Sequence, residues 1–323
     1  MRIIQFIDNQ NRPQVGTVRS NLVRPLDKVQ SVYELFMHSD KLGIAFSDAV
    51  LSLETNSSFD YEELMTRGAI LLPVDHPDPY HTWVTGTGLT HLGSATSRDQ
   101  MHKGKDFNSD QLTDSIKIFQ AGIKNGKLLD NKPGVQPEWF FKGNGLSVSP
   151  PGANIISPAF ALNGGEEPEV AGIYIIDKNG MPKRLGFVIG NEFSDHEMEK
   201  LNYLYLAHSK LRPCSYGPEL LIGDLPSEVK GKSMIIRNGE KLWEKEFFTG
   251  EGYMSHNIAN LEYHHFKYDL FRQPGDLHVH FFGTSVLSFT DNIIAEDGDL
   301  FVIEAEGMGK PLINKLSIQA PSI

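Results

Sequence analysis

The fold of this chain is decided by residues 167–192, which read EPEVAGIYIIDKNGMPKRLGFVIGNE. The apolar run at 170–176 predicts a buried strand, and the DKNG sequence at 177–180 predicts a hairpin turn. A second apolar run at 185–189 predicts the returning strand. Because a hairpin lays the end of its second strand beside the start of its first, the acidic residues at the two ends of this stretch are expected to lie close together.

Three carboxylates flank this hairpin. Glu167 and Glu169 are separated by one residue, so their side chains share a face of the strand, and the hairpin returns Glu192 beside them. Carboxylates gathered in this way repel one another unless a cation neutralises them, and Mg²⁺ prefers such all-oxygen ligands. The pattern therefore predicts a divalent metal site, the alternative being exposed charges on an edge strand and at a helix start.

The composition is that of a soluble globular protein, with 40% hydrophobic and 22% charged residues among 323. A net charge of −11, with no basic run longer than a dipeptide, argues against nucleic acid or an anionic membrane as partner. Cys214 is the only cysteine, so no intrachain disulfide can form. The start of the chain turns polar too soon for a signal peptide, and no membrane-length apolar run follows. A cytoplasmic protein is expected.

Two domains are expected. Residues 71–79 are rich in proline and predict a linker, which separates a small N-terminal α/β domain (1–75) from a larger domain (76–323). In the small domain, residues 1–18 predict a strand pair and residues 27–53 show helical spacing. The core positions expected from that spacing are Val32, Leu35, Phe36 and Leu42.

The larger domain is punctuated by Gly and Pro and is expected to consist mainly of short strands. Its helix is expected at 194–205, with Asp195 and Glu197 in the first turn, where acidic residues suit the helix dipole. The chain is therefore expected to be a strand-rich α+β protein with a mixed sheet. Strands are expected at 170–176, 185–189, 233–237, 241–248, 277–282 and 300–305.

A polar stretch with little apolar surface follows His91 and extends to about Asp110. It has helical character, and it comes after a small-residue segment at 85–90. These features predict a mobile lid rather than a core element.

Two lysines stand among apolar neighbours: Lys142 follows an aromatic run, and Lys210 follows the sequence LAHS. Such a lysine either extends to solvent or pairs with an anion. The local pattern of each lysine, taken alone, predicts a surface position. Beside a metal site, both lysines would supply positive charge for binding an anionic substrate.

In the order and spacing of its motifs the chain resembles the fumarylacetoacetate hydrolase family over roughly residues 80–320. The resemblance implies a mixed β-sandwich or β-roll catalytic domain, Mg²⁺ or Mn²⁺ held by Glu167, Glu169 and Glu192, and a homodimer or homotetramer. It implies that Lys210 is the active-site lysine and that Thr284, beside Gly283, contacts a substrate carboxylate. The motifs are FFK (140–142), EPE (167–169), GFVIGNEFS (186–194), SK (209–210), YGP (216–218), GT (283–284) and EDGD (296–299).

The chain also departs from the family pattern. Glu192 replaces the usual aspartate, and His196 stands where the family has an arginine that would contact substrate. Hydrolases of the family carry a lid histidine followed three residues later by glutamate, which together activate water. Here residues 88–95 read GLTHLGSA, so His91 lies one position early and lacks the glutamate. Without that carboxylate, His91 is a poorer general base for water.

The segment around Thr87 and the run LYLAHSK at 204–210 resemble instead the sugar-acid branch, the 2-keto-3-deoxy-pentonate (arabinonate) dehydratases. This resemblance implies a Mg²⁺-dependent dehydratase of a 2-keto-3-deoxy sugar acid, a small keto acid. Lys210 or Lys142 would be the base for the C3 proton, provided that burial lowers its pKa, and His91 or a more distant acidic group would donate a proton to the departing water. Substrate-binding residues would be Thr284, Gly283, His196 and Thr87.

Two alternatives stay open. The first is a hydrolase that cleaves a C–C bond of a 2,4-diketo acid or acylpyruvate. The second is a binding or regulatory protein that has lost its catalytic groups.

The other motifs are expected to be structural. His278 and His280 would share a strand face, as a zinc pair does, but the sequence offers no nearby third ligand. His264 and His265 are adjacent and would point apart on a strand. Cys214 is expected to be a small buried side chain.

Overall fold

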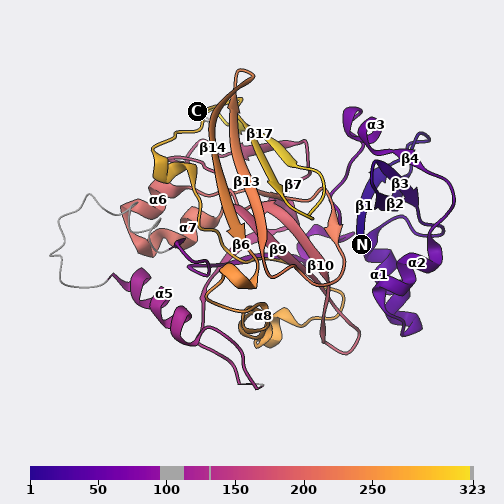
Figure 1. Ribbon diagram of the computed structural model, residues 1–323, viewed down its shortest axis with the longest axis horizontal. Helices are drawn as coiled ribbons and strands as arrows, with labels where there is room; N and C mark the ends of the chain where they lie inside the picture. Colours follow the sequence, from indigo (N-terminus) through magenta and orange to yellow (C-terminus); the bar gives the residue numbers. More distant parts are fainter. Residues whose placement is uncertain (95–112, 131, 321–323) are drawn as a thin grey trace.

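The computed structural model describes residues 1–94, 113–130 and 132–320, whose strands form two sheets (Figure 1). The larger sheet has twelve strands, with β4-β3-β2-β1-β12-β10-β9-β15-β5-β6 as its main path and with β11 and β7 beside β10. The smaller sheet has the order β14-β13-β16-β17-β8. Both sheets contain parallel and antiparallel pairs. The strand-rich, mixed α+β class expected from the sequence is confirmed.

The larger sheet comprises β1 (Arg2–Ile7), β2 (Pro13–Arg19), β3 (Leu22–Pro25), β4 (Phe59–Asp60), β5 (Thr82–Gly88), β6 (Glu138–Asn144), β7 (Val148–Ser149), β9 (Pro168–Ile176), β10 (Pro182–Asn191), β11 (Cys214–Tyr216), β12 (Leu220–Leu221) and β15 (Leu277–Phe281). The smaller sheet comprises β8 (Asn154–Ser157), β13 (Val229–Arg237), β14 (Glu240–Thr249), β16 (Leu300–Ala305) and β17 (Leu312–Ile318). The described α-helices are α1 (Val32–Leu42), α2 (Phe46–Leu53), α3 (Tyr61–Thr66), α5 (Asp114–Asn125), α6 (His196–Leu201), α7 (Leu206–Lys210) and α8 (Ile258–Phe266).

The expected hairpin is formed by β9 and β10, which lie in the interior of the larger sheet. Its turn is closed by a hydrogen bond from the Gly180 amide to the Asp177 carbonyl, at 3.0 Å. The Asp177 carboxylate accepts two further amide hydrogen bonds inside the turn. Every residue of β9 is buried, because both faces of this part of the sheet are covered.

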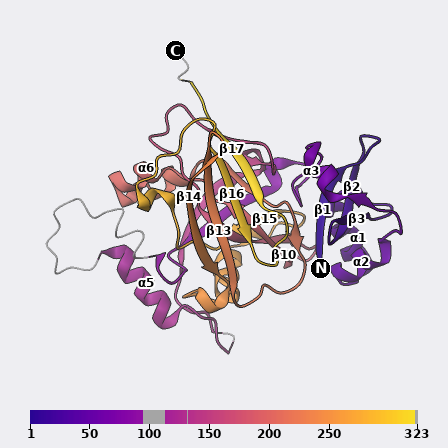
Figure 2. The ribbon, with the colours of Figure 1, turned by 45° about the horizontal axis from the view of Figure 1, so that its top comes forward.

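The two sheets pack face to face as a β-sandwich. Phe187 and Ile189 of β10 point into the core that they share with Phe247, Phe301 and Leu316 of the smaller sheet. Val188, between them, belongs to the core on the opposite face. Figure 2 shows the strands of the smaller sheet side by side over this face. Alternate residues of one strand thus anchor two separate cores.

The N-terminal elements, β1 to β4 with α1 to α3, lie at one end of the sandwich, and α6 and α7 lie at the other (Figure 1). The larger sheet runs through both parts, since β1 pairs with β12 and β12 pairs with β10. One core cluster also joins Val32 of α1 to Val279 of β15. The division into domains 1–75 and 76–323 stays a prediction.

Three local expectations need correction. Leu42 was expected in the core but is 57% exposed, because α1 ends there, beyond its buried stripe of Val32, Leu35 and Phe36. The helix expected at 194–205 ends at Leu201, because Asn202 is extended, with φ −162° and ψ 131°. His264 and His265 lie on α8, not on a strand.

Two remaining observations concern the chain as a whole. The lid expected between His91 and Asp110 lies mostly outside the described residues. Within the described part of the chain, every helix is too short or too polar to span a bilayer.

Candidate active site

Glu167, Glu169 and Glu192 meet at the open end of the β9–β10 hairpin. The strands pair so that Gly190 lies opposite Glu169, and the Glu192 amide donates to the Glu167 carbonyl at 3.0 Å. One carboxylate oxygen from each glutamate lies within 4.8 Å of the others, and all three residues are buried. The convergence predicted from the hairpin is therefore present, and the hydrogen-bonded register of two strands produces it.

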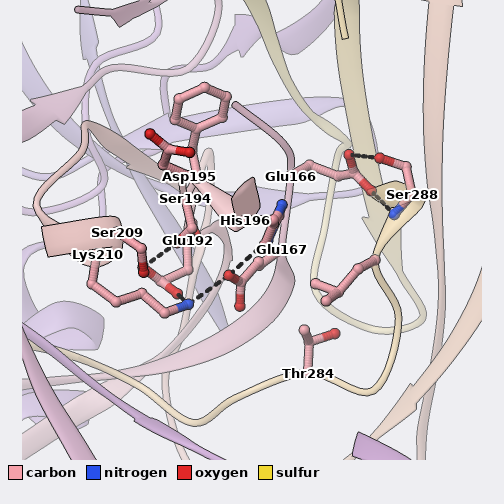
Figure 3. A network of polar contacts seen from close by, with 12 residues as sticks. Glu166, Glu167, Glu192, Ser194, Asp195, His196, Ser209, Lys210, Thr284 and Ser288 are labelled. Carbon is pink, nitrogen blue, oxygen red and sulfur yellow. Dashed lines mark hydrogen bonds and ion pairs between the residues drawn. The ribbon is translucent and has the colours of Figure 1, made fainter. Parts of the chain in front are cut away.

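Two lysines contact this triad. Lys210 Nζ lies 2.5 Å from Glu167 Oε1 and 2.5 Å from Glu192 Oε2, and Figure 3 shows the ammonium between the two carboxylates. Lys142 Nζ lies 2.6 Å from Glu192 Oε1. Both lysines are almost completely buried, so neither is a surface residue. Each lysine therefore pairs with an anion and does not extend to solvent.

Every N–H group of the Lys142 ammonium has an acceptor. Besides Glu192, its ammonium donates to the carbonyls of Phe193, at 2.6 Å, and of Lys210, at 3.1 Å. An ammonium has three N–H groups, and three acceptors use them all. Lys142 was a candidate base, but the structure gives it the geometry of a fixed cation that holds Glu192 in place.

Lys210 lines a cavity beside the triad, and its ammonium also lies 4.8 Å from the centre of the Phe140 ring. Burial alone would lower the pKa of Lys210, but the charges of Glu167, Glu192 and Glu199 outweigh it and raise the pKa. A lysine base requires a lowered pKa. Lys210 does not meet this requirement while the charged carboxylates lie beside its ammonium.

Glu169 is the carboxylate with the least compensation. Burial raises its pKa well above the ordinary value, and the charges of Glu192 and Glu167 raise it further. Its carboxylate accepts a hydrogen bond from the Gly283 amide at 2.7 Å. Among the described residues, no lysine, arginine or histidine lies within ion-pair distance of it. A buried carboxylate without an ionic partner binds a cation favourably, because the cation compensates its negative charge.

The donor set fits a hard divalent cation. All three side chains offer carboxylate oxygens, which Mg²⁺ and Mn²⁺ prefer, and the oxygens are close enough together to share one ion. Lys142 and Lys210 leave Glu169 without an ionic partner, so positive charge is still lacking. The structure thus contains a buried acidic triad that can bind a metal ion.

The cavity beside the triad has a volume of about 30 Å³. This is room for an ion with a water molecule, so a larger ligand requires the walls to move. Of the residues expected at the site, the ones that line the cavity are Glu167, Glu169, Lys210, His196, Thr87, Gly283 and Thr284.

The two candidates for carboxylate binding have distinct surroundings. The Thr284 hydroxyl accepts a hydrogen bond from the Val286 amide at 3.2 Å. Gly283 adopts φ +96°, and a Cβ there would lie 2.4 Å from Thr90 Oγ1. Only glycine fits this position, and its amide orients Glu169, a role that the sequence did not reveal.

His196 is the first residue of α6 and contacts the triad. Its Nε2 is 3.1 Å from Glu167 Oε1, and its ring packs 5.3 Å from that of Phe289. Its Nδ1 is buried without a hydrogen-bond partner among the described residues. His196 therefore helps to position Glu167 as well as forming part of the cavity wall.

His91 does not occupy the place expected of a catalytic acid. Its Nε2 lies 2.8 Å from Thr249 Oγ1, its Nδ1 lies 3.1 Å from Thr90 Oγ1, and it is not part of the cavity wall. Burial lowers the pKa of His91 to about 4. Both nitrogens of His91 are engaged away from the cavity in this arrangement, and its role as the acid stays a prediction.

His278 and His280 are core histidines, as expected. His278 Nδ1 lies 3.0 Å from His265 Nε2, and His280 Nδ1 lies 2.8 Å from Thr85 Oγ1. Burial lowers the pKa of His278 and of His280 to about 3. Cys214 is also buried, as expected.

The cavity wall also contains residues that the sequence analysis did not assign to the site, among them Glu199 and Phe140. Glu199 follows His196 by three positions on α6, so both side chains face the cavity, and this spacing could have been recognised. Phe140 shares a face of β6 with Lys142, which the alternation of a strand also predicts.

No family model matches this sequence, and no curated protein matches it. Similar solved structures exist. A 2-keto-3-deoxy-D-arabinonate dehydratase complexed with magnesium and 2,5-dioxopentanoate has a TM-score of 0.71 at 20% identity. The fumarylacetoacetate hydrolase of Exiguobacterium antarcticum has 0.61 at 14%, and a 5-carboxymethyl-2-hydroxymuconate delta-isomerase of Mycobacterium smegmatis has 0.59 at 16%. Each match covers 99% of this chain and 100% of the other.

Identities this low establish the fold alone. The TM-score is higher for the dehydratase than for the hydrolase or the isomerase. The chain therefore has the fold of the fumarylacetoacetate hydrolase family, in the form most similar, among these three, to that of a sugar-acid dehydratase.

Proposed function

We propose that this protein is a Mg²⁺-dependent hydro-lyase that removes water from a 2-keto-3-deoxy sugar acid. The observation that carries the proposal is the buried triad of Glu167, Glu169 and Glu192, with the Lys210 ammonium beside it at the wall of a cavity. The similar structure of a dehydratase, which was solved with magnesium and 2,5-dioxopentanoate, supports it.

The residues at the triad suit a 2-oxo acid. When bound, Mg²⁺ (or Mn²⁺) supplies a positive charge that stabilises negative charge developing on the oxygens of such a substrate. Thr284, which lines the cavity, would contact the substrate carboxylate, and the neighbouring Gly283 amide holds Glu169. Thr87 adds a hydroxyl to the cavity wall. Lys210 lies against the triad, so its ammonium, once it has taken up a proton, would add a second positive charge there.

Removal of water from such a substrate takes a proton from C3 and hydroxide from C4. Lys210 is the remaining lysine candidate for the C3 proton, since Lys142 has all its N–H groups engaged. The charges that keep Lys210 protonated are chiefly those of Glu167 and Glu192. These are proposed metal ligands, so neutralising them removes the cause of the raised pKa. The product of this step has a double bond between C3 and C4. When the substrate is a pentonate, loss of a proton from C5 and tautomerisation through a dienol then give a 2,5-dioxo acid.

The proposal includes a cytoplasmic location, a small keto acid as the partner, and a homodimer or homotetramer. The experiment that tests the activity is incubation of purified protein and Mg²⁺ with a 2-keto-3-deoxy-pentonate and, separately, with an acylpyruvate. Formation of a 2,5-dioxo acid, followed by NMR, is the expected result. Release of pyruvate from the acylpyruvate would instead establish a C–C hydrolase. Metal-dependent binding without turnover would establish a binding protein.

A Glu192→Gln variant controls for traces of other enzymes. It keeps the size of the side chain but removes one ligand charge, so it should lose the activity of the wild-type protein. Equal product formation by this variant would contradict the proposed site.

A further inference from the structure

Glu199 gives the cavity wall a third carboxylate, beside those of Glu167 and Glu169. It lies on α6, is 2% exposed, and lines the same cavity as Glu167, Glu169 and Lys210. Together with His196 it forms the buried face of this short helix, while Glu197 lies on the other side and pairs with Lys200 at 3.2 Å. Glu199 is near enough to Lys210 for its charge to affect that ammonium.

The cavity wall offers little positive charge to a second anionic group. Among the described residues that line it, Lys210 is the only lysine or arginine; it pairs with Glu167 and Glu192 in this structure and is assigned to the 2-oxo acid end of the ligand in the proposed function. The nearby Arg212 pairs with the buried Asp195 at 2.8 Å. The remaining polar side chains of the wall are largely hydroxyls, those of Thr87, Ser94 and Thr284.

The carboxylate of Glu199 distinguishes ligands by their tail, which is the end of the molecule away from the 2-oxo acid group. The tail can carry a hydroxyl group or a second carboxylate. A hydroxyl group can donate a hydrogen bond to Glu199, and such bonds to a charged acceptor are stronger than neutral ones. A second carboxylate on the ligand has no proton to donate and meets a like charge in a buried place. Repulsion of this kind selects against a competing ligand as effectively as attraction selects the right one.

We propose that Glu199 sets the substrate class of the site: it binds the hydroxyl groups of a neutral tail and excludes 2-oxo acids that carry a second carboxylate. The inference rests on the proposed function, because it places the 2-oxo acid end of the ligand at the triad. It extends that function by assigning the selection against dicarboxylates to one side chain.

Two ligands of equal chain length test the inference. 5-Hydroxy-2-oxopentanoate and 2-oxoglutarate share the 2-oxo acid end and differ in having a hydroxymethyl or a carboxylate group at the other end. Neither has a hydroxyl at C4, so neither can lose water in the proposed reaction, and equilibrium binding can be measured by calorimetry with Mg²⁺ present. The wild-type protein should bind the hydroxy acid about tenfold more tightly or better.

Two variants separate the effect of the Glu199 charge on binding from an effect of unfolding. In Glu199→Gln the preference should shrink to about threefold or less, chiefly because 2-oxoglutarate binds more tightly than it does to the wild-type protein. Glu197→Gln removes the same charge from the other face of α6 and should keep the wild-type preference. Thermal melting of each variant shows whether the fold is retained.

Pyruvate distinguishes a failure of this inference from a failure of the proposed function, because it has the 2-oxo acid end but no tail. If pyruvate binds with Mg²⁺ and Glu199→Gln leaves the preference unchanged, the role of Glu199 is wrong and the proposed metal site stands. If pyruvate does not bind the wild-type protein in the presence of Mg²⁺, both are overturned.

Discussion

Lys142 and Glu192 form a fully enclosed ion pair, with 2.6 Å between Nζ and Oε1 and no exposed surface on either side chain. Removing one member of such a pair leaves the other charge buried with less compensation. Lys142→Met should therefore lower the free energy of unfolding by about 3 kcal/mol or more, measured by urea denaturation. Lys241→Met, which removes an exposed lysine paired with Glu244, is the matched control and should change little. A loss in Lys142→Met as small as that of the control would show that the pair is not needed.

Metal binding should stabilise the protein through Glu169. Without a cation, burial and the charges of Glu192 and Glu167 disfavour the ionised form of this carboxylate. Mg²⁺ added at about 100 times its dissociation constant should stabilise the fold by roughly 2.7 kcal/mol, read as a rise in Tm that a chelator reverses. Glu169→Gln should lose most of this rise, whereas Glu240→Gln, on the surface, should keep it. An equal response in the two variants would place the metal elsewhere.

Lys210 should be needed for turnover more than for binding. Arginine at this position keeps the positive charge but cannot release a proton at ordinary pH. Lys210→Arg should therefore lower kcat by about 10²–10⁴, while pyruvate binding with Mg²⁺ stays within about tenfold of the wild type. Lys241→Arg supplies the control for the substitution itself. Activity of Lys210→Arg near the wild-type level would remove Lys210 from consideration as the base.

Much of the site could be predicted because it is local in sequence. The strands that bring Glu167, Glu169 and Glu192 together are neighbours in the chain, and their register follows from one turn and one local shift between Arg184 and Gly186. Contacts across long separations could not be predicted. Gly283 donates to Glu169 across 114 positions, and this contact depends on β15 pairing with β9.

The surroundings of His91 could not be predicted for a related reason. Its place in the sequence resembles that of a lid histidine, but its environment is set by Thr249, 158 positions away. The number of acceptors around a buried lysine is equally hidden from the sequence. Lys142 and Lys210 look alike in their local patterns, and only the carbonyls of Phe193 and Lys210 make one of them a fixed cation.

His91 should make the stability depend on pH. In the unfolded chain its pKa is near the ordinary 6.5, whereas burial in the folded protein lowers it to about 4. Between these values the unfolded state binds a proton that the folded state does not, so stability falls as the pH falls. From pH 7 to pH 5 this one group should cost about 2 kcal/mol.

His91→Gln removes that titration, so its stability should fall less than that of the wild-type protein between pH 7 and pH 5. Urea denaturation at the two pH values gives the difference. The same variant should keep its turnover at pH 7 once its fold is confirmed, because His91 is not part of the cavity wall. Parallel curves for the two proteins would show that His91 is not buried in the neutral form.

Gly283 should link backbone geometry to metal affinity. An alanine there would have to adopt φ +96° and would place its Cβ 2.4 Å from Thr90 Oγ1 and 2.8 Å from the Thr87 carbonyl. Gly283→Ala should therefore destabilise the fold by about 1–3 kcal/mol and, by moving the amide that holds Glu169, weaken Mg²⁺ binding. Gly307→Ala separates the two effects, because Gly307 has φ +78° with no atom near the added Cβ. That control should show the strain but keep the metal affinity, so an equal loss of affinity in both variants would mean that the Gly283 amide does not position Glu169.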